Sequence, residues 1–205
     1  MNLIVKGDGV AVVTLDVDGA KVNSLNKKLF DDFDQILKTI ESSSDIKSVV
    51  IKSGKNNSFI AGADINMLLD FKTAEEAEDL SKLSHDFFFR IEKSKKPVVA
   101  AINGDCLGGG LEVALACHYR IATTNPKTKL GLVEALIGLL PGGGGTQRLP
   151  ALVGIQESLT MMTTGKKVVP AKAKKIGLVD QVCDPFALEH AGEISFTSLL
   201  FIIFV

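Results

Sequence analysis

Two glutamates stand in apolar surroundings beside runs of glycine. Glu112 is followed by Val-Ala-Leu-Ala-Cys in "GGGLEVALAC" (108–117), and Glu134 is the only polar side chain of "LGLVEALIGLL" (130–140). Burying an unpaired carboxylate costs free energy, so each acid needs either a partner or a functional environment. Two carboxylates that share a desolvated site repel each other, which raises the pKa of one of them and suits a pair that does both acid and base work.

The glycine runs do not have the spacing of nucleotide-binding loops. "GGGGTQR" (142–148) lacks the Lys-Ser/Thr pair of a phosphate-binding loop, and "GDCLGGGLE" (104–112) spaces its glycines differently from a dinucleotide-binding turn. What remains is glycine that lets the backbone come close to a ligand or adopt a positive φ.

Two glycine turns follow predicted strands and can present free backbone amides. Residues 108–110 lie where a helix starts, so their N–H groups are unpaired and the helix dipole favours negative charge. The turn "AGAD" (61–64) ends another strand and can aim a second amide at the same point, which would form an oxyanion hole. Taken alone, each is better explained as a tight turn. With the two glutamates, they indicate chemistry on a carbonyl compound whose α-carbon or β-carbon reacts.

The elements that must position these residues alternate along the chain. Apolar residues at helical spacing predict a helix over 26–42, and the capping-box pair Thr73 and Glu76 opens another over 74–94. A short buried helix is expected within 108–117, and Gly177 ends a lysine-rich helix. Apolar runs bounded by turn residues predict strands within 9–16, 46–54, 58–65, 96–104 and 118–124. The pattern indicates one α/β domain with largely parallel, buried strands.

Composition excludes several classes of partner. A net charge of -1 argues against nucleic acid or an anionic membrane, and the basic stretch 165–175 is interpreted as a solvated face. Neither the histidines nor the cysteines have metal-ligand spacing, so no metal is expected, and free thiols in a reduced compartment are favoured over disulfides. These residues are His85, His118, His190, Cys106, Cys117 and Cys183.

Three segments resemble the signatures of the crotonase, or enoyl-CoA hydratase/isomerase, superfamily. They are "FIAGADINM" (59–67), "AINGDCLGGGLEVALACHYRIAT" (101–123) and "IGLLPGGGGTQRLP" (137–150). The likeness is closest to members that form the amino-terminal hydratase domain of multifunctional enzymes of fatty-acid β-oxidation, and it runs from about residue 3 to about 190. It implies a crotonase fold of stacked ββα turns over a domain 1–190, followed by an atypical apolar tail, 191–205.

The resemblance implies addition of water to a trans-2-enoyl-CoA, giving a 3-hydroxyacyl-CoA. The amides of Ala63 and Gly109 would hold the thioester oxygen, Glu112 would activate the water, and Glu134 would deliver the α-proton. No cofactor is implied, since coenzyme A is part of the acyl-CoA thioester substrate. A homo-oligomer, or association with a thiolase subunit, is the implied assembly. Further substrate and coenzyme A contacts would be Ala61, Gly62, Asp64, Ile65, Gly110, Pro141 and Gly142.

The chain also departs from the family pattern. Val133 stands where the family usually has proline before the second glutamate, which would loosen the orientation of Glu134. The likeness stops before the helices that usually follow, and "SFTSLLFIIFV" (195–205) is apolar but too short to span a bilayer. We therefore expect a truncated product with impaired activity.

Two alternative functions remain open. A Δ3,Δ2-enoyl-CoA isomerase needs only one acid, so the presence of both Glu112 and Glu134 favours hydration. A non-catalytic fragment that binds acyl-CoA or a partner chain is the other. The resemblance implies a mitochondrial matrix location, but no targeting segment is visible, which a bacterial cytoplasm would explain more simply.

Overall fold

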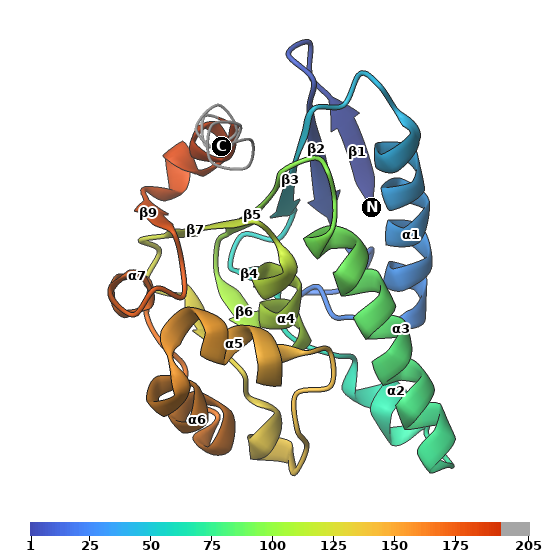
Figure 1. Cartoon of the computed structure of the whole chain (residues 1–205), viewed down its shortest axis with the longest axis vertical. Coiled ribbons are helices and arrows are strands. Elements are labelled where there is room, and N and C mark those ends of the chain that lie inside the picture. Colours follow the sequence, from blue (N-terminus) through green and yellow to red (C-terminus); the bar gives the residue numbers. More distant parts are fainter. Residues whose placement is uncertain (194–205) are drawn as a thin grey trace.

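A computed structural model of the chain describes residues 1–193, in which helices surround two sheets (Figure 1). The main sheet has the strand order β1-β2-β3-β5-β7-β9. Strand β1 is antiparallel to β2, and every other pair is parallel, so the expectation of largely parallel strands is confirmed. Its strands are β1 (Asn2–Val5), β2 (Val10–Leu15), β3 (Ser48–Ser53), β5 (Val98–Ile102), β7 (Tyr119–Thr123) and β9 (Gln181–Cys183).

The central strands of this sheet are covered on both faces. In β5, Val98, Ala100 and Ile102 belong to the larger core, whereas Val99 and Ala101 face a smaller cluster on the other side with Leu188. A strand buried on both faces reads as a continuous apolar run, which is why "VVAAI" could be recognised in the sequence.

A second, three-stranded parallel sheet positions the glycine turns. It consists of β4 (Ser58–Ile60), β6 (Asp105–Leu107) and β8 (Lys129–Gly131). Strands β4 and β6 pair in parallel, so the turns that follow them, 61–64 and 108–110, emerge at the same edge. The sequence did not predict β6 and β8, because three residues are too few to show an alternating pattern.

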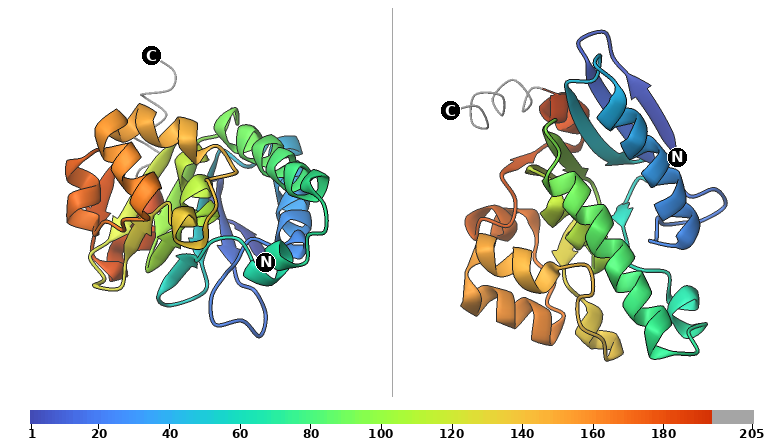
Figure 2. Two further views of the ribbon diagram at one scale, coloured as in Figure 1. Left: turned by 90° about the horizontal axis from the view of Figure 1, so that it is seen from below. Right: turned by 45° about the vertical axis from the view of Figure 1, so that its right-hand side comes forward.

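The predicted helices are present, and two of them pack together on one side of the sheets (Figure 2). The ring of Phe87 lies 5.5 Å from Phe30 and 4.8 Å from Phe33, joining α3 to α1. The expected capping box of Thr73 and Glu76 opens α3. The helices are α1 (Lys27–Ser42), α2 (Ile65–Leu69), α3 (Ala74–Glu92), α4 (Gly109–Ala116), α5 (Gly145–Val153), α6 (Ile155–Thr164) and α7 (Pro170–Lys175), with 3-10 turns η1 (Glu134–Ile137) and η2 (Pro185–Ala187).

Helix α4 occupies the centre of the molecule. All its residues from Gly110 to Ala116 are buried. A Cβ on Gly110 would lie 2.3 Å from the carbonyl oxygen of Ile60, so the helix packs on β4 at a distance that only glycine permits. This close approach brings the start of α4 against the turn that follows β4.

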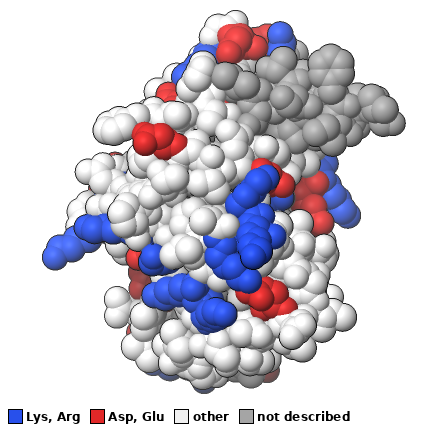
Figure 3. All heavy atoms as spheres, turned by 90° about the vertical axis from the view of Figure 1, so that its left-hand side faces the viewer, with Lys and Arg blue, Asp and Glu red and all other residues white. Residues whose placement is uncertain are grey.

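The basic stretch 165–175 lies on the face shown in Figure 3, where lysine and arginine side chains gather. Lys172 pairs with Glu157 at 3.2 Å, and Lys174 donates to the carbonyl oxygen of Asp180. Lys166 and Lys175 are exposed, which agrees with the interpretation as a solvated face, whereas Lys167 of the same stretch lines a pocket.

The expected boundary at residue 190 falls within a helical segment, 188–193, and stays a prediction. The apolar stretch 195–205 lies outside the described residues. Within residues 1–193, no helix combines the length and apolar character needed to cross a membrane. All three cysteines are free thiols.

Candidate active site

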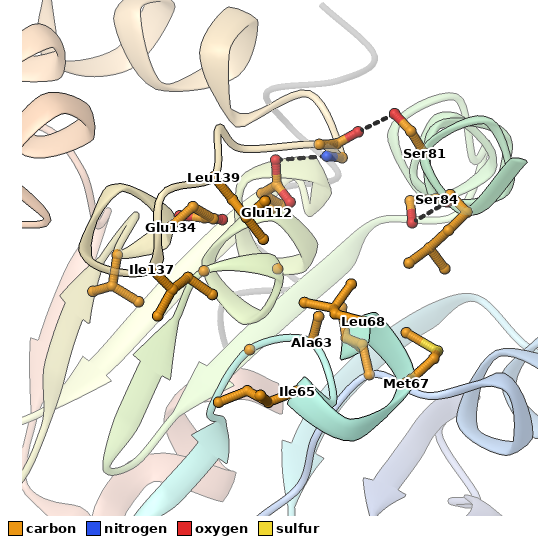
Figure 4. Close-up of a pocket in the computed structure, with 18 of the residues that line it drawn as sticks. Ala63, Ile65, Met67, Leu68, Ser81, Ser84, Glu112, Glu134, Ile137 and Leu139 are labelled. Carbon is orange, nitrogen blue, oxygen red and sulfur yellow. Dashed lines mark hydrogen bonds between the residues drawn. The ribbon is translucent and has the colours of Figure 1, made fainter. Parts of the chain in front are cut away.

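A largely apolar pocket of about 430 Å³ lies beside the glycine turns, between helices α2 and α3 and the segment 133–143. Figure 4 shows Glu112 and Glu134 on one side of it, across from Met67 and Leu68 of α2. Eight of the residues predicted for the site line this pocket: Ala61, Gly62, Ala63, Ile65, Gly109, Glu112, Glu134 and Gly142.

Three predicted contact residues do not line the pocket. Asp64 caps α2 by accepting from the amide of Asn66, and Gly110 packs against Ile60. Pro141 is buried at the start of the glycine loop 142–145. Asp64 and Gly110 shape the backbone around the site, and the substrate contacts expected of all three residues stay predictions.

The turn after β4 presents the first free amide. Leu25 donates to the carbonyl oxygen of Gly62 at 2.8 Å and accepts from Asp64 at 2.9 Å, which fixes the turn on both sides of Ala63. Gly62 has φ 120°, which favours glycine. The N–H of Ala63 donates to no group in the described part of the chain.

Gly109 presents the second amide as the first residue of α4. Its N–H has no acceptor among residues 1–193, as expected at a helix start. A Cβ on Gly109 would lie 3.9 Å from the nitrogen of Ala63, so the two amides are neighbours. Two free amides beside one pocket can stabilise an oxyanion.

Glu112 projects from α4 and is 4% exposed. Its Oε1 accepts from the amides of Gly143 and Gly145, both at 2.8 Å, while its Oε2 accepts no hydrogen bond from the described residues. Burial raises the pKa of this carboxyl, and the two amides act against that shift by stabilising the charged form.

Glu134 begins the η1 turn, and its carboxylate lies close to Gly108 of the opposite turn. Oε2 is buried and has no hydrogen-bond partner in the described part of the chain. Burial raises the pKa of Glu134 to about 7, and the charge of Glu112 acts in the same direction. The two acids therefore share a desolvated site, and Glu134 is about half protonated at neutral pH, where an ordinary glutamate is ionised.

The stretch around Glu134 is less buried than its composition suggests. Leu136 is 63% exposed and Leu140 is 81% exposed, whereas Leu130 and Leu132 belong to the core. The η1 turn forms the rim of the pocket, so its apolar side chains face outward or into the pocket opening. An apolar run in the sequence does not distinguish a rim from a core.

Val133 has φ −103° and ψ 5°, well away from the φ near −65° that proline imposes. Its carbonyl oxygen accepts from the amide of Leu136 at 3.0 Å, closing the η1 turn. Although position 133 is valine and not proline, Glu134 lines the pocket. Whether its orientation is looser than with proline stays a prediction.

Sequence reasoning missed the contribution of α3. Ser81, Ser84 and Phe88 line the pocket, and Ser81 donates to the carbonyl oxygen of Gly142 at 2.7 Å. Their spacing of three and four residues places them on one helical face, a signal that was available. The spacing was not recognised as a binding face because a serine on a helix rich in charged residues is usually taken to be solvent-exposed.

Residues 1–193 bring together no group of three histidine, cysteine or acidic side chains that could hold a metal. His118 accepts a hydrogen bond from the amide of Val98 at 3.0 Å, so its role is structural.

The turns after two parallel strands present two adjacent free amides, and two desolvated carboxylates lie beside them. This arrangement is typical of a protein that acts on a carbonyl compound by acid and base chemistry. The family model for enoyl-CoA hydratase/isomerase matches residues 6–193, and the chain belongs to this family.

Relatives and solved structures agree with this assignment. The chain is 55% identical to the fatty acid oxidation complex subunit alpha of Shewanella loihica over 85% of this chain and 25% of the relative. The chain is 51% identical to the same subunit of Idiomarina loihiensis, over 91% of this chain and 27% of the relative. The chain thus spans about a quarter of the length of these relatives. Both are bacterial, which gives no support to the mitochondrial location.

The fold is that of solved enoyl-CoA hydratases. The chain matches the Bacillus anthracis enzyme with a TM-score of 0.89 and 30% identity, over 97% of this chain and 76% of that one. It matches the Thermoplasma volcanium enzyme with a TM-score of 0.83 and 35% identity, over 91% of this chain and 72% of that one. The predicted crotonase fold is confirmed.

Proposed function

We propose that this chain is the 2-enoyl-CoA hydratase part of a fatty-acid oxidation enzyme. It adds water to a trans-2-enoyl-CoA and gives a 3-hydroxyacyl-CoA. The observation that carries the proposal is the convergence of two free amides, of Ala63 and Gly109, on the pocket that also holds Glu112 and Glu134.

The two amides serve the thioester carbonyl. As water attacks the β-carbon, negative charge develops on the thioester oxygen, which accepts hydrogen bonds from Ala63 and Gly109. Losing one donor of this kind costs about 2.7–4 kcal/mol of transition-state stabilisation. The positive end of α4, which begins at Gly109, acts in the same direction.

The carboxylates divide the proton transfers. Glu112 takes a proton from the attacking water, whose hydroxyl bonds to the β-carbon, and Glu134 gives its proton to the α-carbon. The two amides on Oε1 of Glu112 support an ionised base. The pKa of about 7 supports Glu134 as an acid that is protonated near neutral pH. Neither transfer needs a cofactor or a metal.

The pocket walls indicate where the substrate lies. Met67, Leu68, Phe88 and Ile137 offer an apolar surface that suits an acyl chain. The coenzyme A part would leave along the turn 61–65, which contributes Ala61, Gly62 and Ile65 to the same pocket.

The names and the bacterial origin of the relatives support a proposal for the assembly and the location. They are named as the alpha subunit of a fatty acid oxidation complex, so we propose that this chain takes part in such a complex, with a thiolase subunit as partner. Their bacterial origin supports the bacterial cytoplasm. A homo-oligomer is a further proposal from the family resemblance.

Loss of enoyl absorbance from crotonyl-CoA tests the proposed reaction. We expect turnover by the chain and its collapse in both Glu112→Gln and Glu134→Gln, with the exposed Glu78→Gln as the matched control. Folded variants that keep full activity would contradict the two-acid mechanism. A folded parent chain that binds acyl-CoA without turnover would identify a binding fragment.

A second candidate reaction is Δ3,Δ2-isomerisation. The unpartnered, buried Oε2 of Glu134 favours it, because one acid of raised pKa suffices to move a proton between two carbons. With a 3-enoyl-CoA as substrate, this reaction predicts activity that survives in Glu112→Gln and is lost in Glu134→Gln.

A further inference from the structure

The glycine loop 142–145 holds the base of the proposed reaction, and it is built from four residues with little conformational preference of their own. The amides of Gly143 and Gly145 both donate to Oε1 of Glu112. Rotation of either peptide group would remove a donor from a buried carboxylate. Something outside the loop must therefore fix these peptide groups.

Ser81 of α3 fixes the first of them. Its Oγ donates to the carbonyl oxygen of Gly142 at 2.7 Å. That carbonyl belongs to the same planar peptide group as the N–H of Gly143, which donates to Glu112 at 2.8 Å. One peptide plane is thus held at both ends, by α3 and by the carboxylate (Figure 4).

Arg148 of α5 fixes the next peptide group. Its Nη1 donates to the carbonyl oxygen of Gly143 at 2.9 Å. This peptide lies between the two whose amides reach Glu112, so holding it restricts both neighbours. A Cβ on Gly143 would come within 2.7 Å of Oε2 of Glu112, so no larger residue fits at position 143.

The guanidinium of Arg148 is itself oriented by α3. Its Nε and Nη2 donate to Oε2 of Glu92 at 3.0 and 2.7 Å, and it lies over the ring of Phe89 at 5.2 Å. The side chain is only 11% exposed. A planar group held by a carboxylate, a ring and a carbonyl has little freedom to move.

We propose that Ser81 and Arg148 are positioning residues that fix the glycine loop so that its amides remain on Glu112. Neither residue touches the reacting atoms, and both act from outside the loop. The inference deepens the proposed hydratase function and rests on it for its catalytic consequence. Its structural consequence, the state of the Glu112 carboxylate, can be measured without any turnover.

Loss of these contacts has a defined effect on Glu112. A loop that no longer presents both amides stabilises the carboxylate less, and removing the charge of Arg148 acts in the same direction, so the pKa of Glu112 rises further. The charged or titratable groups that face Glu112 are His85 from α3, Arg148 from α5 and Glu134 from η1. A His85→Gln variant separates the contribution of the imidazole.

Matched controls are available on the same scaffold. Arg90 of α3 pairs with Asp34 and Glu41 of α1, away from the pocket, so Arg90→Gln removes a comparable ion pair. Ser42 donates to a carbonyl within its own helix, so Ser42→Ala is the control for Ser81→Ala. Arg148→Lys keeps the charge but cannot reproduce the planar fork.

The experiment combines kinetics with a carbon-13 NMR titration of the Glu112 carboxyl, assigned with Glu112→Gln. In Arg148→Gln we expect kcat for crotonyl-CoA to fall about tenfold or more, with KM nearly unchanged. In the same variant, the midpoint of the Glu112 carboxyl titration should rise by roughly one pH unit. Ser81→Ala should lose roughly three- to tenfold, and Arg148→Lys should recover part of the loss. The Arg90→Gln and Ser42→Ala controls should match the parent.

The outcomes separate the two proposals. If Arg148→Gln and Ser81→Ala match their controls in both kcat and the Glu112 midpoint, the positioning role is overturned. If the parent chain does not hydrate crotonyl-CoA but the Glu112 midpoint still rises in Ser81→Ala, which keeps the charge of Arg148, the positioning role stands and the hydratase proposal fails. Loss of activity in Arg148→Gln and Ser81→Ala with an unchanged Glu112 titration midpoint would also overturn the positioning role.

Discussion

The carboxylate of Glu134 lies directly over Gly108. A Cβ on Gly108 would come within 3.3 Å of Oε1 and 3.5 Å of the carboxyl carbon of Glu134. Gly108 also has φ +52° and ψ −128°, a backbone conformation that other residues rarely adopt. The residue that opens the turn into α4 therefore also sets how far the proposed acid can enter the pocket.

Gly108→Ala should impair the proposed hydratase through this contact. At 3.3 Å the added methyl group requires the carboxylate to move by a few tenths of an ångström. Because a misplacement of about 1 Å can cost on the order of a hundredfold in rate, we expect this smaller shift to lower kcat by only about a few-fold. The strained backbone adds about 1–3 kcal/mol of destabilisation. The change is measured as kcat for crotonyl-CoA together with the urea midpoint.

The control for this variant is Gly19→Ala. Gly19 has φ +71°, and a Cβ there meets nothing within 4 Å. It should cost stability, about 1–2 kcal/mol, and leave kcat unchanged. Equal kcat values for the two variants would refute the proposed contact between position 108 and Glu134.

The pH dependence of hydration should follow the two carboxyls. Glu134 must be protonated to deliver the α-proton, so kcat/KM should fall as pH rises through about 7, the pKa to which burial raises this group. Glu112 must be ionised, so an acidic limb should appear above the usual glutamate range, because burial raises its pKa too. A kcat/KM that keeps rising well above neutral pH would exclude Glu134 as the acid.

Much of the site could be recognised from the sequence, because its signals are local. Glu112 and Glu134 are single acids in apolar stretches, and the glycines beside them interrupt strand-to-helix transitions. Thr73 and Glu76 mark a helix start through contacts three residues apart. Each of these features needs only neighbouring residues to be interpreted.

The remaining features depend on contacts between distant residues. Ser81 meets Gly142 across 61 positions, and Arg148 meets Glu92 across 56. Periodicity can assign such side chains to a face of a helix, but it does not say which loop that face meets. For the same reason the exposure of Leu140, at the pocket rim, could not be told from burial.

A partly buried ion pair holds β7, the strand that follows the central helix α4. Arg120 is 5% exposed, and its Nη2 lies 2.8 Å from Oδ2 of Asp180, which also accepts from the Arg120 amide. Its Nη1 donates to the carbonyl oxygen of Cys117, and its Nε has no hydrogen-bond partner in the described part of the chain. Among the described residues, Asp180 is the only carboxylate that pairs with Arg120. The pair joins β7 to the segment that leads into β9.

Asp180→Asn should destabilise the chain by about 3 kcal/mol, the lower end for leaving a buried charge unpaired, because Asp180 is partly exposed. Urea unfolding measures the change. Asp32→Asn, which removes an exposed pair with Lys28, should cost much less, because water screens the attraction between exposed charges. Similar losses in the two variants would show that Arg120 finds another partner.

Glu134 should make the stability of the chain depend on pH. Its pKa is about 7 in the folded state against a usual 4.5, because burial penalises the charged form. The stability that the neutral carboxyl allows is fully present below 4.5 and is lost as pH rises through about 7.

Glu134→Gln removes this titration and keeps the side chain's size. The free energy of unfolding of the variant relative to the parent should therefore be higher at about pH 8 than at about pH 5, as measured by urea unfolding at both values. The exposed Glu78→Gln should show no such difference. If the relative stability of Glu134→Gln were the same at both pH values, Glu134 would have to be as well solvated as Glu78, and its assignment as a buried acid would be wrong.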